Sequence, residues 1–209
     1  MSKSQAGLVP IEAARFLIYG DHDAGKVDVS DHIGLQINAG LAFGTGHHGT
    51  TAGCLILFVR LLQQNISPIH CLDLGCGAGI LSIAAAKTLK RHILATDIDQ
   101  DAVDVTLQNA GINQVSPLIE AQRSDGFNDP LFKGRKFDLI FANILAGPLM
   151  ELAPEILNHT SDEGYVILSG ILKEQKNTVA THFNGHGLKI LDDEPLGEWV
   201  SLLGRKSLA

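Results

Sequence analysis

The sequence has little of what marks specialised protein classes. Its 209 residues include only 3 cysteines, 7 prolines and 5% aromatic residues. With 45% hydrophobic and 19% charged residues, this composition excludes a disordered tail, a collagenous repeat and a coiled coil. Because aromatic residues are few, aliphatic side chains must build most of the core. The length suits one large α/β domain, which can bury a substantial core without covalent cross-links.

Long apolar runs and positive charge are also scarce. No apolar run reaches the roughly 18 residues of a membrane span, and the first five residues, Met1 to Gln5, lack the apolar stretch of a signal peptide. We therefore expect a cytoplasmic protein with no membrane partner. Only 16 Lys and Arg stand against 23 Asp and Glu, for a net charge of −7. This balance argues against direct nucleic-acid binding and favours a basic protein partner.

The three cysteines are Cys54, Cys71 and Cys76, an odd number in apolar surroundings. This predicts buried free thiols in a reducing compartment. Their spacing does not match the paired ligands of structural zinc sites, so we expect no metal.

The first 45 residues are expected to form an N-terminal β segment and a covering loop, and residues 46–209 a Rossmann-like core, within one domain. Two short apolar runs, Arg15 to Gly20 and Ile33 to Ile37, predict a β-hairpin with a long loop. A glycine-rich turn follows at 39–49. Apolar residues then recur at helical spacing from Thr50 to Gln64, and the sequence 49–51 marks the start of that helix.

Beyond residue 68 strands and helices alternate, which predicts an α/β fold with a mostly parallel sheet covered on both faces. The connection at 193–198 is too short for a crossover, so the final pair should be antiparallel. We expect seven strands, near 70–74, 92–97, 116–120, 137–142, 164–169, 187–192 and 199–203, and helices near 79–89, 101–112, 146–158 and 173–184.

The segment between the first of these strands and its helix carries a glycine motif. Gly75, Gly77 and Gly79 would let the backbone approach a ligand at a helix N-terminus. Dinucleotide-binding folds favour a different glycine spacing. Glycines at alternate positions, two residues after Asp73, are typical of folds that bind S-adenosylmethionine. We expect Asp73 to accept from the amino group of that cofactor, and a plain tight turn is the alternative.

The next strand ends at Asp97, eighteen residues after Gly79. A carboxylate about twenty residues beyond the glycines is where such folds bind ribose hydroxyls. We prefer Asp97 for this role and expect Asp99 to cap the following helix. Adenine contacts are expected from the stretch 123–126, which carries no distinctive residue.

Asn143 follows the strand at 137–142. In a parallel sheet, the carboxyl end of this strand should face the same crevice as the glycine loop. The amide carbonyl of Asn143 could accept from a substrate amine and orient it for methyl transfer, which would make it the catalytic residue. The alternative is that Asn143 only caps the next helix.

The chain resembles the ribosomal large-subunit protein eleven methyltransferases, a family of class I S-adenosylmethionine-dependent enzymes, from about Gly7 onward. The segments that carry the resemblance are 42–51 (AFGTGHHGTT), 97–99 (DID), 142–146 (ANILA), 169–172 (SGIL) and 197–200 (GEWV).

The resemblance implies a protein N-methyltransferase that uses S-adenosylmethionine. We expect the protein to be a monomer. Its substrate would be ribosomal protein eleven, methylated on lysine ε-amino and N-terminal α-amino groups. It also implies that the cofactor is contacted by Thr51, Gly75, Asp97 and Asn143. The glycine motif adds Gly77 to these expected contacts. The loop that contains Phe43 and Thr45 would cover the cofactor.

The chain departs from the family pattern at position 47, where Thr is commoner than His, and at 49, where Pro is commoner than Gly. A catalytic base among His47 and His48 is therefore not expected. Family members usually carry a further N-terminal recognition domain, which we expect to be missing here. Two alternatives stay open: methylation of another protein or of a small-molecule amine, and a cofactor-binding module without activity.

Overall fold

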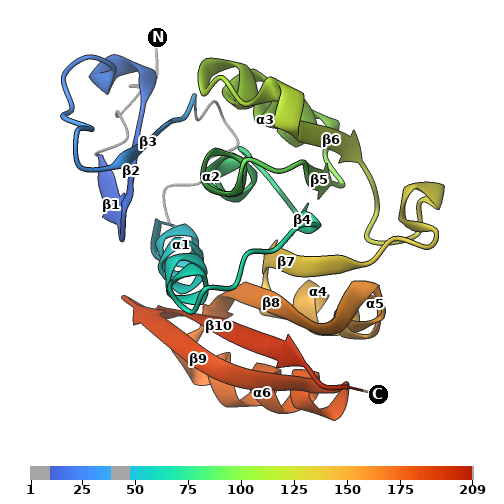
Figure 1. The fold of residues 1–209 in the computed structure, drawn as a ribbon. Helices are drawn as coiled ribbons and strands as arrows, with labels where there is room; N and C mark the ends of the chain where they lie inside the picture. The colour runs from blue at the N-terminus through green and yellow to red at the C-terminus, as the bar shows by residue number, and fades with distance from the viewer. Residues whose placement is uncertain (1–9, 39–47, 209) are drawn as a thin grey trace, which may run out of the picture.

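The larger of two β-sheets forms the centre of the molecule (Figure 1). The computed structural model describes residues 10–38 and 48–208. The strand order of this sheet is β6-β5-β4-β7-β8-β10-β9. Its strands are β4 (Cys71–Leu74), β5 (Ile93–Asp97), β6 (Ile119–Arg123), β7 (Phe137–Asn143), β8 (Thr160–Leu172), β9 (Leu188–Leu196) and β10 (Trp199–Lys206). β4 to β8 pair in parallel, and β10 lies antiparallel between β8 and β9. The predicted seven-stranded, mostly parallel sheet with an antiparallel last strand is therefore confirmed.

Helices cover both faces of this sheet. They are α1 (His48–Gln63), α2 (Ile80–Leu89), α3 (Gln100–Ile112), α4 (Ala146–Glu151), α5 (Ala153–His159) and α6 (Lys176–Gly185). Because successive strand residues point to opposite faces, Cys71 packs with α1 and α2, whereas Leu72 packs with α4 to α6. Two apolar cores result, one on each face. The glycine loop follows the carboxyl end of β4, an interior strand of the sheet.

Short 3-10 turns lie between these elements, and prolines explain two shifted boundaries. They are η1 (Asp21–Asp23), η2 (Ser116–Leu118), η3 (Pro130–Phe132) and η4 (Lys173–Gln175). The strand expected at 116–120 begins only at Ile119, because Pro117 lies in η2 and has no N–H for a sheet ladder. The helix expected at 146–158 is divided into α4 and α5. Pro154 cannot donate to the carbonyl of Met150, which the ring Nε2 of His182 contacts at 2.9 Å instead.

The N-terminal segment is a separate three-stranded sheet of β1 (Ile11–Ala13), β2 (Phe16–Tyr19) and β3 (Ile33–Gln36). A hairpin is present, but its strands are β1 and β2. The expected antiparallel pairing of 15–20 with 33–37 is wrong, because β2 and β3 pair in parallel. The connection at 20–32 is long enough for the chain to cross over before it pairs, as a parallel pair requires. Three residues of β1 are too few to show a strand pattern.

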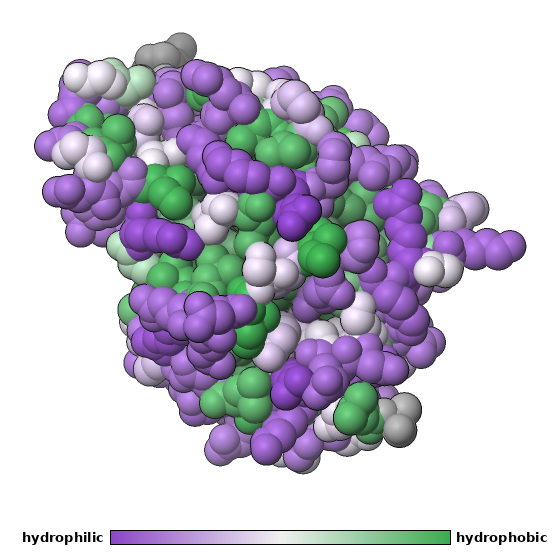
Figure 2. Space-filling model, in the orientation of Figure 1, coloured by the Kyte–Doolittle hydropathy of each residue, from purple (hydrophilic) through white to green (hydrophobic). Residues whose placement is uncertain are grey.

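One face of the molecule has apolar residues near its middle, between the N-terminal sheet and the β9–β10 hairpin, with hydrophilic residues around them (Figure 2). A hollow of about 570 Å³ lies between the β1–β2 turn and the C-terminal end of α1, lined by Ala14, Arg15, Asp31, Val59, Leu62 and Gln63. The other end of α1 reaches Asn143, so this hollow is remote from the glycine loop. No helix in the described part of the chain is long and apolar enough to cross a membrane.

Candidate functional site

The glycine loop leaves β4 and enters α2 with backbone angles that side chains rarely adopt. The φ angles of Gly75, Gly77 and Gly79 are 73°, 53° and 77°. The N–H groups of Gly75 and Cys76 donate to the carbonyl of Thr96 at 2.8 and 3.0 Å, which attaches the loop to β5. A Cβ at Gly77 would meet no atom of the described residues within 4 Å. The loop therefore offers bare backbone at Gly77, which fits a ligand that lies against it.

Asp97, at the end of β5, supports the middle of this loop. Its Oδ2 accepts from the N–H of Gly77 at 2.9 Å, and its Oδ1 accepts from the N–H of Asp99 at 3.1 Å. Asp99 caps α3, because its carboxylate accepts from the N–H of Asp101 at 2.9 Å. The expected cap at Asp99 is confirmed. The structure brings Asp97 next to the glycine loop, and its contact with ribose stays a prediction.

Asp73 lies inside the sheet, with 1% of its surface exposed. Its Oδ2 accepts from the backbone N–H of Ser82 at 3.0 Å and from the Ser82 hydroxyl. Its Oδ1 has no partner among the residues that the structure describes. Burial raises the pKa of the Asp73 carboxyl to about 6, and the hydrogen bonds from Ser82 oppose that rise. A buried acceptor without a partner at the start of the glycine motif fits the predicted contact with a cofactor amine.

Asn143 ends β7, the neighbour of β4, and its side chain contacts α1. Its Nδ2 donates to the hydroxyl of Thr51 at 3.3 Å. The N-cap of α4 is Leu145, and no side chain caps that helix. The alternative in which Asn143 only caps the next helix is therefore wrong. Thr51 is 7% exposed and lies in the first turn of α1, so the structure brings together two residues that are 92 positions apart in the sequence.

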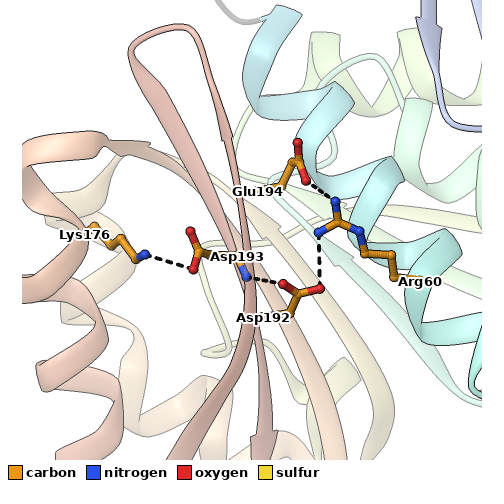
Figure 3. A network of polar contacts seen from close by, with 5 residues as sticks. All are labelled: Arg60, Lys176, Asp192, Asp193 and Glu194. Carbon is orange, nitrogen blue, oxygen red and sulfur yellow. Dashed lines mark hydrogen bonds and ion pairs between the residues drawn. The ribbon is translucent and has the colours of Figure 1, made fainter.

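A buried hydroxyl pair holds the N-terminal turn of α1 on the sheet. The hydroxyls of Ser169 in β8 and Ser201 in β10 are 2.7 Å apart, and the Ser169 hydroxyl donates to the carbonyl of Thr50 at 3.2 Å. Farther along α1, Arg60 pairs with Asp192 and Glu194 of β9 (Figure 3). These contacts orient the helix that carries Thr51.

Gly170 sets the position of the segment after Asn143. Its φ is 78°, and a Cβ there would lie 2.1 Å from the carbonyl oxygen of Ile144. The Ile144 side chain in turn covers Gly75, where a Cβ would meet its Cγ2 at 2.5 Å. Leu145 is 58% exposed beside this contact. A polar amide thus lies next to apolar side chains at the edge of the glycine loop.

The remaining predicted site residues lie in the segments 43–48 and 123–126. Phe43, Thr45 and His47 lie outside the described residues, and α1 begins at His48, one residue before the expected start. The stretch 123–126 folds back on β5: the N–H of Ser124 donates to the carbonyl of Asp97 at 2.8 Å. Its adenine contacts stay a prediction.

The three cysteines are free and buried, as expected, and the described residues hold no group of side chains that could bind a metal.

Sequence reasoning missed the residues that position the site. Ser169 and Ser201 are small polar residues in apolar strands, and Gly170 appeared only as part of a resemblance. A serine in the middle of a buried strand is the signal that could have found the first two, because a buried hydroxyl needs a partner.

The comparisons with known proteins identify one family. A family described as ribosomal protein L11 methyltransferase (PrmA) matches residues 1–207. The ribosomal protein L11 methyltransferase of Rhodopseudomonas palustris (strain BisB5) is 44% identical over 208 residues, which are 99% of this chain and 70% of that protein. Its counterpart in Brucella suis (strain ATCC 23445 / NCTC 10510) is 47% identical over 189 residues, 90% of this chain and 66% of that protein. The chain therefore spans about two thirds of the length of these relatives.

Among solved structures, a ribosomal protein L11 methylase from Lactobacillus delbrueckii subsp. bulgaricus has a similar fold, with a TM-score of 0.83 and 29% identity. The alignment covers 95% of this chain and 99% of that one.

Proposed function

The chain belongs to the ribosomal protein L11 methyltransferase family, and on this premise we propose that it transfers methyl groups from S-adenosylmethionine to amino groups of ribosomal protein L11. The acceptors would be lysine ε-amino groups and the N-terminal α-amino group. The observation that carries the proposal is the position of Asn143, one strand from the glycine loop and hydrogen-bonded to Thr51.

The residues around the glycine loop fit the cofactor. Gly77 provides bare backbone, and Gly75 would contact the cofactor beside the Ile144 side chain. Asp97 would bind the ribose hydroxyls, and Asp73 holds a buried acceptor for the amino group. Thr51 and Asn143 would contact the cofactor near the methyl group. Phe43 and Thr45 keep the covering role that the family resemblance implies. When bound, S-adenosylmethionine supplies a methyl group on a positively charged sulfur.

Asn143 would orient the substrate amine. Its Nδ2 is engaged with Thr51, so its carbonyl oxygen is the group that can accept from an amine N–H. A lysine amine has an ordinary pKa of about 10.4 and is mostly protonated at neutral pH. The apolar side chains of Ile144 and Leu145 would favour its neutral form, because a low-polarity environment disfavours charge. The chain itself would act by alignment and exclusion of water rather than as a strong base.

The charge of the chain suits a basic protein substrate. Its net charge of −7 favours encounter with a lysine-rich partner and disfavours direct contact with nucleic acid. We propose that the enzyme acts as a monomer in the cytoplasm.

Calorimetric titration with S-adenosylmethionine, followed by addition of purified ribosomal protein L11 and an intact-mass measurement, tests the proposal. We expect binding and mass increments of whole methyl groups on the protein. Transfer to other amines but none to L11 would favour the alternative substrates. Binding without any transfer would favour a cofactor-binding module, and no binding would refute the site.

Two variants separate the roles. Asp97→Ala should weaken cofactor binding by about tenfold or more, because it removes charged hydrogen bonds. Asn143→Ala should mainly lower kcat. Asp99→Ala is the matched control: it loses a helix cap, worth about 1 kcal/mol of stability, and should bind the cofactor like the wild type. Wild-type affinity in Asp97→Ala, together with wild-type turnover in Asn143→Ala, would overturn the assignment.

A further inference from the structure

A buried polar stripe runs along one face of α3 and ends at Asn113, the C-cap of the helix, whose Nδ2 donates to the carbonyl of Asn109 at 2.9 Å. Thr106, Asn109 and Asn113 follow each other at intervals of three and four residues, so they share one face of the helix. Thr106 and Asn109 are fully buried, and Asn113 is 7% exposed. Buried polar side chains are costly unless they are hydrogen-bonded, so the partners of this stripe show what it does.

Two members of the stripe hold the carbonyl groups of the glycine loop. The Thr106 hydroxyl donates to the carbonyl of Gly77 at 2.9 Å, and the Asn109 Nδ2 donates to the carbonyl of Ala78 at 2.8 Å. In a planar trans peptide the C=O and the following N–H point in opposite directions. With the carbonyl of Gly77 directed at α3, the N–H of Ala78 points away from it. The Thr106 bond therefore sets the side on which the loop presents the N–H of Ala78. The Asn109 bond fixes the carbonyl of Ala78, and the N–H that follows it, that of Gly79, donates to the carbonyl of Cys76 at 2.8 Å.

Asn109 and Asn113 also hold the segment at 36–38, in which β3 ends. The Asn113 amide accepts from the N–H of Gln36 at 3.2 Å and donates to the Gln36 carbonyl at 2.6 Å. The Asn109 amide accepts from the N–H of Asn38 at 2.9 Å and donates to its carbonyl at 3.4 Å. Each side chain therefore pairs with the backbone as a neighbouring strand would. The Nδ2 of each asparagine has a second acceptor: for Asn109 it is the carbonyl of Ala78 in the glycine loop, whereas for Asn113 it is the carbonyl of Asn109 within the helix.

We propose that Asn109 is a positioning residue for the cofactor: together with Thr106 it holds the glycine loop in its binding conformation and ties that loop to the segment at 36–38. This inference rests on the proposed function, since it takes S-adenosylmethionine as the ligand of the loop. Asn109 acts through Ala78, and Thr106 acts through Gly77.

Asn109→Ala and Asn113→Ala form a matched pair of variants. Both remove a buried amide from the same face of α3 and free the same segment, but only Asn109→Ala frees the carbonyl of Ala78. We expect both to lower the Tm to a similar extent. We expect Asn109→Ala to raise the Kd for S-adenosylmethionine about fivefold or more, the worth of one net hydrogen bond, and Asn113→Ala to leave it within about twofold.

Thr106 supplies a second test that preserves shape. Thr106→Val keeps the side-chain volume and loses the bond to Gly77, so the Kd should rise, whereas Thr106→Ser keeps the hydroxyl and should restore affinity. Hydrogen exchange of the amides at 75–79 in the ligand-free protein provides a readout that does not need the cofactor. Exchange should accelerate in Asn109→Ala and Thr106→Val and stay at the wild-type rate in Asn113→Ala.

The outcomes separate this inference from the proposed function. If the wild type does not bind S-adenosylmethionine but the contrast in exchange persists, the proposed function fails and the bracing of the loop stands. The positioning role of Asn109 is refuted if the wild type binds S-adenosylmethionine and Asn109→Ala and Asn113→Ala raise its Kd equally. It is also refuted if the wild type binds and neither variant raises the Kd. Equal exchange rates at 75–79 in the two asparagine variants would refute it as well.

Discussion

Replacement of Gly170 by alanine tests whether the segment after Asn143 is placed by contact with β8. Gly170 has a φ of 78°, and an added Cβ would lie 2.1 Å from the carbonyl oxygen of Ile144 and 2.6 Å from its carbonyl carbon. Neither atom belongs to a flexible side chain, so the backbone at Ile144 must move.

The size of the effect follows from these distances. An ordinary contact between a carbon and a carbonyl oxygen is about 3.3 Å, so Ile144 must retreat by about 1 Å. A displacement of that size in a group that aligns a substrate can lower kcat by about a hundredfold. The left-handed backbone adds a stability cost of about 1–2 kcal/mol, and overpacking adds about 1–3 kcal/mol.

Gly187→Ala is the control, because Gly187 also has a positive φ, 92°, but no atom of the part of the chain that the structure describes lies within 4 Å of its added Cβ. It should lose stability through strain alone and keep the kcat of the wild type. We expect Gly170→Ala to lose about a hundredfold in kcat, with the Kd for S-adenosylmethionine changed by less than about threefold. The two quantities are measured by methyl transfer and by calorimetry on protein shown to be folded. A kcat within threefold of the wild type would refute the placement of this segment by Gly170.

Three further predictions concern buried charge, thiols and a surface ion pair. Because burial raises the pKa of Asp73 from 3.8 to about 6, the folded state holds its proton more tightly, and stability falls as the pH rises through that window. Relative to the wild type, Asp73→Asn should gain about 3 kcal/mol of unfolding free energy in urea between pH 3.5 and 7.5, and a pH-independent difference would contradict this. Burial also raises the pKa of the Cys54 and Cys71 thiols to about 12, so a disulfide reagent at pH 8 should label the protein only after unfolding. Arg60→Met should cost about 1 kcal/mol at low salt and less in 1 M NaCl, since the Arg60 side chain is 40% exposed; a salt-independent loss would exclude the ion pairs as its cause.

The sequence by itself determined the elements that have a local cause. Apolar periodicity located the helices and most strands of the main sheet, because burial on a helix or a strand repeats at a regular interval. The glycine motif and Asp97 were recognisable because a strand, a tight turn and a helix follow each other directly in the chain. Asp99 was assigned to its cap for the same reason, since capping joins residues two positions apart.

Only the tertiary structure decided the contacts between distant segments. Thr51 meets Asn143 because α1 packs beside β7, and no local pattern records that pairing. The parallel pairing of β2 with β3 depends on where a long connection runs, which thirteen mostly polar residues do not reveal. Gly170 and Asn109 act on the site through backbone carbonyls, at Ile144 and Ala78, and no local pattern in the sequence shows which carbonyl three-dimensional packing brings beside each residue. The chain thus encodes its chemistry locally, whereas the alignment of that chemistry arises only when the sheet and the helices assemble.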